Sequence, residues 1–119
     1  MDHDVLSKFN CKWMIKENTH PPAVRLATDM TLLGNKIYMF GGYNKNALNE
    51  LFIIDPKTAK WKQIQPKNKK PEHRYGHTIC TYKGALIIVG GEQKYNEDIR
   101  QREAFADVWQ YNPNRNEYT

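Results

Sequence analysis

The sequence predicts an all-β protein built from repeated four-stranded antiparallel sheets. Three observations predict this fold class: a block of residues recurs after about 50 positions, the apolar runs are short and rich in β-branched residues, and Gly, Asn and Pro separate them. The chain has 119 residues, the size of one domain or part of one. Its longest apolar run, Ala85–Val89, is far shorter than the ~20 apolar residues of a membrane-spanning helix.

The repeat appears when Arg25 is placed over Arg74, a shift of 49 residues. Each copy then shows, in order, an arginine, a double glycine, Asp or Asn before proline, and an aromatic residue. These are Arg25, Gly41-Gly42, Asp55-Pro56 and Trp61 in the first copy, and Arg74, Gly90-Gly91, Asn112-Pro113 and Tyr118 in the second. The shift grows to 57 residues at the prolines, so the second copy has eight extra residues after its glycines.

Each copy is expected to form four short strands. In the first copy they are Asp29–Leu33, Lys36–Phe40, Glu50–Ile54 and a strand around Trp61; in the second they are Thr78–Tyr82, Ala85–Val89, Asp107–Tyr111 and a strand around Tyr118. The second strand of each copy is apolar throughout, a pattern typical of a sheet that is covered on both faces. Glycine and asparagine between the first two strands favour tight turns, and proline favours a turn before the fourth strand.

This ordered set of residues resembles the kelch repeat, and the resemblance runs from Arg25 to Thr119. It implies a β-propeller, a ring of four-stranded antiparallel blades. The sequence departs from the family's pattern at Tyr118, where the family usually has Trp, and at Ile54, where Tyr is common. The segment Asp4–Asn10, followed by Trp13, is similar to the end of a repeat.

The chain therefore resembles a partial propeller of about two and a half blades. We expect residues 1–18 to supply the third and fourth strands of an incomplete blade. Residues 19–66 would form the first complete blade, and residues 67–119 the second, with a longer connection between its second and third strands. Propellers typically need ~4–8 blades, and repeats bury their apolar faces against neighbours. Further blades in the same or another chain are thus expected; the alternative is a complete chain that assembles with another copy or partner.

Antiparallel strand order predicts that the long connections Tyr43–Asn49, Gln65–Arg74 and Glu92–Ala106 meet at one end of the blades. Long polar loops on a rigid sheet are the usual place for recognition. The third connection mixes acidic and basic residues, which suits a protein partner, and the chain has no nucleic-acid motif. The expected partner-binding residues are Tyr43, Lys45, Lys70, Tyr95, Arg100 and Arg102. A merely solvated surface is the alternative for the charged connections.

The other repeated residues are expected to be structural. The glycine pairs fit neither a Gly-x-Gly-x-x-Gly nor a Walker pattern, and we expect them to end a strand where backbones crowd. The arginines are expected to bind neighbouring carbonyls or carboxylates, Asp29 to pair with a basic neighbour such as Arg25, and His77 to bond to the backbone. The structural residues are Gly41, Gly42, Gly90, Gly91, Trp13, Trp61, Tyr118, Arg25 and Arg74.

No catalytic residue, metal or cofactor is expected. His73 and His77 are four residues apart, but they lie at the entry to a strand rather than on a helix. Cys11 and Cys80 form neither a disulfide framework nor a four-ligand zinc site, and we interpret them as reduced thiols of a cytoplasmic protein.

Two functional hypotheses follow. The first is a non-enzymatic protein-interaction module or scaffold. The alternative, which the resemblance also implies, is part of a propeller enzyme of the oxidase, epimerase or specifier-protein type, with its site at the same end of the blades.

Overall fold

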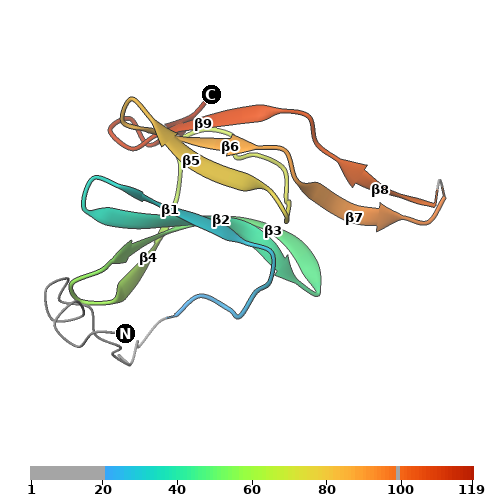
Figure 1. Ribbon diagram of the computed structural model, residues 1–119, viewed down its shortest axis with the longest axis horizontal. Helices are drawn as coiled ribbons and strands as arrows, with labels where there is room; N and C mark the ends of the chain where they lie inside the picture. The colour runs from blue at the N-terminus through green and yellow to red at the C-terminus, as the bar shows by residue number, and fades with distance from the viewer. Residues whose placement is uncertain (1–20, 99) are drawn as a thin grey trace, which may run out of the picture.

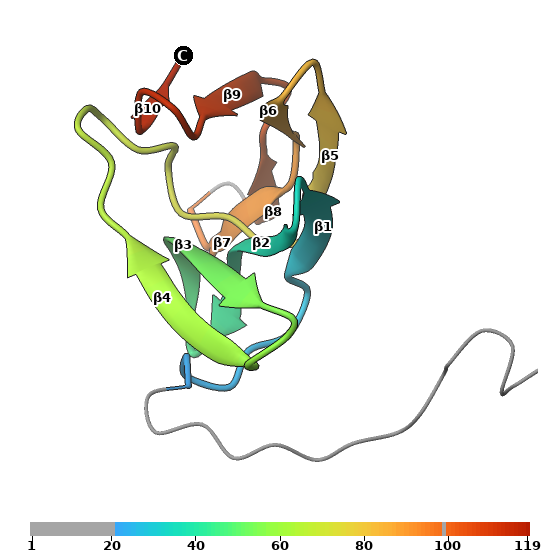
Figure 2. The same cartoon turned by 90° about the vertical axis from the view of Figure 1, so that its left-hand side faces the viewer.

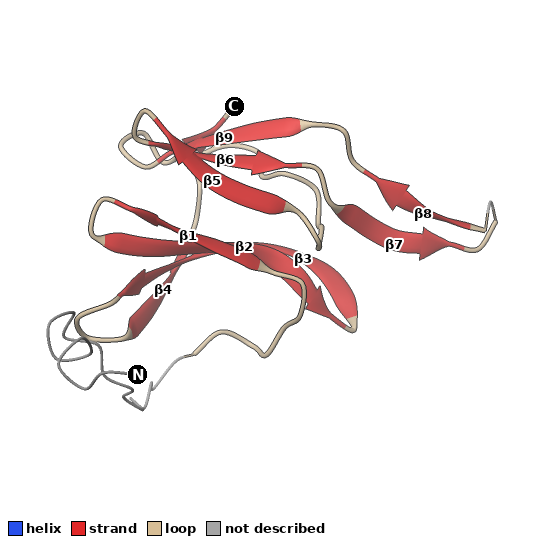
Figure 3. Ribbon diagram, viewed as in Figure 1, coloured by secondary structure: helices blue, strands red, loops and turns tan. Residues whose placement is uncertain are grey.

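The computed structural model describes residues 21–98 and 100–119 (Figure 1). The described residues form strands joined by turns and loops (Figure 3). In chain order the strands are β1 (Asp29–Leu33), β2 (Lys36–Asn44), β3 (Asn46–Asp55), β4 (Lys60–Ile64), β5 (Thr78–Tyr82), β6 (Ala85–Val89), β7 (Glu92–Asn96), β8 (Gln101–Ala104), β9 (Val108–Asn112) and β10 (Glu117–Tyr118).

The strands form two four-stranded antiparallel sheets and a separate hairpin. The first sheet has the order β1-β2-β3-β4, the second has the order β10-β9-β6-β5, and β7 pairs with β8. The all-β class and the four-stranded antiparallel units expected from the sequence are confirmed. Three of the expected strands, now β1, β5 and β6, have the expected bounds.

Two connections that were expected to be loops are strands instead. In the first copy the antiparallel ladder shifts register between Phe40 and Gly42 and then continues to the pair Asn44 and Asn46, so most of Tyr43–Asn49 belongs to a long β2–β3 hairpin. In the second copy the corresponding connection forms the β7–β8 hairpin. Continued pairing gives backbone N–H and C=O groups partners that an open loop would leave to water.

The core lies between the two sheets, and Figure 2 shows β1 and β5, the edge strands of the two sheets, side by side. The buried cluster joins side chains of both sheets: Tyr38, Phe40, Leu51 and Ile64 from the first, and Ile79, Leu86, Ile88, Tyr111 and Tyr118 from the second. Alternate side chains of β6 thus face the first sheet, while Val89 at its end is 42% exposed. The second strand of each copy, now β2 and β6, was expected to be covered on both faces. This holds for Tyr38–Phe40 of β2 but not for the whole of β6.

The expected half blade of residues 1–18, with Trp13 and Cys11, lies outside the described residues. The blade boundaries at 18/19 and 66/67 stay predictions. None of the described segments is a helix long and apolar enough to cross a membrane.

Candidate functional site

A seam of backbone hydrogen bonds fixes the two sheets to each other near the β2–β3 hairpin. The Gly42 N–H donates to the Arg74 carbonyl over 2.9 Å, and the Arg74 N–H donates to the Leu48 carbonyl over 2.9 Å. The Gly76 N–H donates to the Ala27 carbonyl over 2.8 Å. The segment that leads into β5 is therefore held against the first sheet before the second sheet begins.

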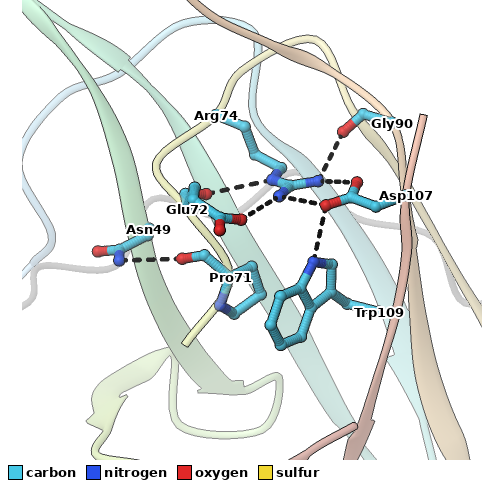
Figure 4. Close-up of polar contacts among 7 residues, drawn as sticks. All are labelled: Asn49, Pro71, Glu72, Arg74, Gly90, Asp107 and Trp109. Carbon is cyan, nitrogen blue, oxygen red and sulfur yellow. Dashed lines mark hydrogen bonds and ion pairs between the residues drawn. The ribbon is translucent and has the colours of Figure 1, made fainter. Parts of the chain in front are cut away.

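The guanidinium of Arg74 is fully buried beside this seam (Figure 4). Its Nη1 donates to Asp107 Oδ1 over 2.6 Å and to the Gly90 carbonyl over 3.1 Å, and its Nη2 donates to Asp107 Oδ2 over 2.9 Å. Glu72 Oε2 lies 3.3 Å from the same Nη2, and the Trp109 indole donates to Asp107 Oδ2. The hydrogen bonds from Arg74 hold the pKa of Asp107 below its usual value.

Arg25 makes the equivalent contacts in the first sheet. Its Nη1 donates to the Gly41 carbonyl over 3.3 Å, and its Nη2 donates to Glu50 Oε1 over 3.0 Å. The expected pairing of Asp29 with Arg25 is wrong, because Glu50 takes the place beside the guanidinium that Asp107 has in the second copy. Asp29 Oδ2 instead accepts the Ile79 N–H over 2.9 Å, so this carboxylate bridges the two sheets.

Three glycines of the two pairs, Gly41, Gly42 and Gly91, lie where the packing leaves little or no room for a side chain. A Cβ on Gly41 would lie 2.7 Å from the Arg74 carbonyl oxygen, and one on Gly42 would lie 3.0 Å from the Leu26 carbonyl oxygen. A Cβ on Gly91 would lie 3.0 Å from the Cβ of His77. Gly41, Gly42, Gly90 and Gly91 all have positive φ angles, which other residues adopt at a cost.

His77 is buried between the two glycine pairs. Its ring meets Phe40 edge to face, with centroids 5.3 Å apart, and only 5% of the residue is exposed. Neither ring nitrogen makes a hydrogen bond of full geometry with the described residues, so the expected bond to the backbone is reduced to a polar contact with the Phe40 backbone. Burial has the largest effect and lowers the pKa of the imidazole. The Phe40 backbone and the charge of Asp29 act in the opposite direction, and the charge of Arg74 lowers the pKa further.

The repeated aromatic residues pack against other rings. Trp61 meets Phe52 with centroids 6.3 Å apart. Tyr118 lies 6.0 Å from the Trp109 ring and 5.1 Å from the Tyr111 ring. Burial raises the pKa of Tyr111 to about 12 and also raises that of Tyr118, as expected for phenols removed from water.

An aromatic pair, of which Tyr43 is exposed and Tyr75 is partly buried, lies at the end of the sheets where the seam is found. Tyr43 and Tyr75 meet edge to face with ring centroids 5.3 Å apart, and Tyr43 is 41% exposed. Leu26 exchanges two backbone hydrogen bonds with Tyr43 and is 73% exposed, and nearby in the chain Val24 is 86% exposed. We call Val24, Leu26, Tyr43 and Tyr75 the apolar rim.

The expectation for partner binding missed Tyr75. The signal was present, because Tyr75 follows Arg74 as Leu26 follows Arg25. The two residues also pair alike in the structure: Leu26 bridges to Tyr43, and Tyr75 bridges to Glu92.

The structure brings together most of the other residues expected to bind a partner. The β2–β3 hairpin, with Lys45 exposed at its turn, and the β7–β8 hairpin extend to the same side of the molecule (Figure 1). Tyr95 of β7 pairs in register with Arg102 of β8, and Arg100 is exposed at their turn.

Lys70 lies apart from these hairpin turns, on the linker between β4 and β5. The residues around it are anchored to the strands: Asn68 bonds to the backbone of Tyr118, and the Asn49 amide donates to the Pro71 carbonyl over 3.1 Å. Lys70 itself is partly buried.

Within residues 21–98 and 100–119, no group of three or more His, Cys, Asp or Glu side chains is placed to hold a metal ion. The geometry thus defines a protein of repeated four-stranded β units, each held by an arginine–carboxylate pair and a double-glycine turn. A family model described as the KLHDC2/KLHL20/DRC7 Kelch-repeats domain matches residues 4–119. The chain belongs to the kelch-repeat family, whose domains are generally protein-interaction modules and usually non-catalytic.

Curated relatives share this region. Human Kelch domain-containing protein 3 is 32% identical over 93 residues, which cover 70% of this chain and 23% of that protein. Human Rab9 effector protein with kelch motifs is 30% identical over 93 residues, covering 73% of this chain and 25% of that protein. Rho GTPase-activating protein gacHH of Dictyostelium discoideum is 28% identical over 100 residues, covering 83% of this chain and 7% of that protein. The chain thus spans a quarter or less of the length of these relatives.

Proposed function

We propose that this chain is a non-enzymatic interaction module that binds a partner protein through the end of the sheets carrying the β2–β3 and β7–β8 hairpins. The observation that carries this proposal is the apolar rim, because it presents two ring systems and two aliphatic side chains at that end. Aromatic residues often supply a large share of the energy of protein interfaces. Charged residues of the hairpins, among them Lys45 and Arg100, would surround the rim and select the partner by charge.

The surrounding structure favours binding because it fixes the rim before a partner arrives. Tyr75 directly follows Arg74, whose backbone and guanidinium are both held by hydrogen bonds. Tyr43 is held by its two backbone bonds to Leu26. Side chains ordered in advance lose less conformational freedom on binding, so more of the contact energy appears as affinity.

The proposal also includes further kelch blades, in this chain or another, and a cytoplasmic location. Val108 of β9 pairs in register with Val89 of β6, and both are exposed on the face of the second sheet that points away from the first. The equivalent strand of the first sheet is buried on both sides at Tyr38–Phe40. A neighbouring blade would give the second sheet the same coverage.

The test compares the proteins that become labelled by a proximity-labelling enzyme fused to the protein. The double variant Tyr43→Ala/Tyr75→Ala should lose labelled partners that the wild type retains. Tyr82→Ala is the matched control, because Tyr82 is also exposed but lies at the opposite end, beside the turn between β5 and β6. An identical set of labelled proteins for all three forms would contradict the proposal.

A further inference from the structure

The positive charge of the chain is concentrated in one segment. Residues 56–70 contain six lysines and no acidic residue, so this stretch has a charge of +6, whereas the whole chain has +5. The six are Lys57, Lys60, Lys62, Lys67, Lys69 and Lys70. The rest of the chain is therefore close to neutral, and this segment dominates the field around the molecule.

Two of these lysines lie on an edge strand. β4 pairs with β3 and is the last strand of the first sheet among the residues that the structure describes. Lys60, Lys62 and Ile64 share one face of β4 because side chains alternate along a strand. Ile64 is buried in the cluster between the sheets, while both lysines are exposed. Lys60 and Lys62 thus project on the face of β4 that is turned toward the second sheet.

The linker that follows β4 adds two further exposed lysines in a fixed place. The Lys67 N–H donates to the Asn116 carbonyl over 2.8 Å. The Asn68 amide exchanges two bonds with the Tyr118 backbone, of 2.5 and 2.8 Å. The linker therefore runs from β4 to the β9–β10 turn and β10 (Figure 2), and Lys67 and Lys69 flank its anchored residue Asn68. We call Lys60, Lys62, Lys67 and Lys69 the basic edge.

We propose that the basic edge binds an extended acidic segment of another protein, which pairs with β4 as an added strand. An edge strand can accept a further strand through its backbone groups, while pockets and charges at alternate positions select the side chains. Lysines on an edge oppose pairing with a second basic strand, such as β4 of another copy. A strand with acidic residues at every second position matches the spacing of Lys60 and Lys62.

Nucleic acid fits the same residues less well. The sole aromatic residue of positions 56–70 is Trp61, and its ring packs edge to face on Phe52 instead of offering a free stacking surface. The segment also has no arginine, the side chain best suited to two-point contacts with phosphate. A peptide backbone, in contrast, supplies the hydrogen bonds that an edge strand lacks.

The experiment measures fluorescence anisotropy of labelled peptides with the whole chain. One peptide alternates Glu and Thr over ten residues, and the other has five Glu followed by five Thr, so their charge and composition are equal. We expect the alternating peptide to bind about tenfold more tightly, with an affinity that falls as salt is added. Equal affinities would overturn the proposal, because the contact would then depend on charge alone.

Variants locate the contact. Lys60→Glu/Lys62→Glu/Lys67→Glu should lose binding of the alternating peptide by about tenfold or more, and Lys60→Gln/Lys62→Gln should weaken it without reversing the charge. Lys83→Glu, at the exposed turn between β5 and β6, changes the net charge by as much as Lys60→Gln/Lys62→Gln does and should bind as the wild type does. Unchanged binding by the first two variants would overturn the proposal. If a ten-nucleotide oligothymidylate bound more tightly than the alternating peptide, the ligand of the basic edge would be nucleic acid and the proposal would be overturned.

Discussion

Arg74 and Asp107 meet through two hydrogen bonds, of 2.6 and 2.9 Å, although 33 residues separate them in the chain. Arg74 leads into β5, Asp107 precedes β9, and the Gly90 carbonyl that also binds the guanidinium follows β6. Because β6 lies between β5 and β9, one side chain connects the ends of three strands. The pair at Arg25 and Glu50 repeats this arrangement in the first sheet.

Replacement of Arg74 should destabilise the protein even when the positive charge is kept. In Arg74→Lys an ammonium replaces the planar group, so the contacts to both Asp107 oxygens and the Gly90 carbonyl cannot all be made. We expect the free energy of unfolding to fall by roughly 2–3 kcal/mol, measured by urea denaturation with tryptophan fluorescence. Arg115→Lys, at an exposed turn, should change it by less than about 0.5 kcal/mol. Equal effects would show that the buried contacts of Arg74 add nothing to stability.

Alanine variants of Gly41 and Gly34 should separate the effect of crowding on stability from the effect of backbone strain. Both have a φ angle of +63°, but a Cβ on Gly41 would lie 2.7 Å from the Arg74 carbonyl oxygen, whereas one on Gly34 would meet nothing within 4 Å. Gly34→Ala should therefore cost about 1–2 kcal/mol of stability, the cost of the left-handed conformation. Gly41→Ala should cost at least about 1 kcal/mol more, because the seam must open. Thermal unfolding should show that Gly41→Ala is the less stable variant. If Gly34→Ala were less stable, crowding of Gly41 at the seam would not limit stability.

The hydroxyls of Tyr118 and Tyr111 should contribute to stability in different ways. The Tyr111 hydroxyl donates to Asn116 Oδ1 over 2.7 Å, whereas the buried Tyr118 hydroxyl has no partner among the described residues. Tyr111→Phe should therefore lower the free energy of unfolding by about 1 kcal/mol, and Tyr118→Phe should leave it unchanged or raise it. Chemical denaturation curves of both variants at neutral pH test this. A larger loss of stability for Tyr118→Phe than for Tyr111→Phe would contradict this prediction.

His77 should make the protein less stable in mild acid. Burial lowers its folded pKa below the ordinary value of 6.5, so the unfolded chain takes up the proton first. The contribution of the neutral ring is complete above pH 6.5 and is lost as the pH falls from 6.5 toward the folded pKa.

Urea denaturation at about pH 7.5 and 5.5 should therefore show a smaller pH dependence for His77→Gln than for the wild type. His73→Gln is the control, because His73 is exposed. A pH dependence equal in all three proteins would contradict the role of His77.

The strands of the two sheets could be predicted because their signals are local. β1, β5 and β6 are bounded by turn residues that end them where expected. The β7–β8 hairpin could not be predicted, because its strands have the sequences EQKYN and QREA, which lack a run of apolar residues. The pairing of β2 with β3 past Gly41 was hidden for another reason: a double glycine usually indicates the end of a strand, and here it marks a shift in register.

The candidate site could not be fully predicted, because it is formed by contacts between the two sheets that are not evident from the sequence. The alignment placed Tyr75 opposite Leu26, but only the packing of the sheets brings Tyr75 against Tyr43. Asp29 likewise found its partner in the Ile79 N–H, 50 residues away, and not in the nearby arginine. Aligning the two copies predicts which residues occupy equivalent positions in them. It does not predict contacts made once, across the seam.

The bonds between Asn68 and Tyr118 also constrain the order of events during synthesis. Asn68 emerges from the ribosome 50 residues before the residue that it binds. The linker from β4 therefore cannot reach its final position until nearly all of the 119 residues have been translated. Because contacts distant in sequence form slowly, the first sheet can fold early, whereas the second closes only after Tyr118 has left the exit tunnel.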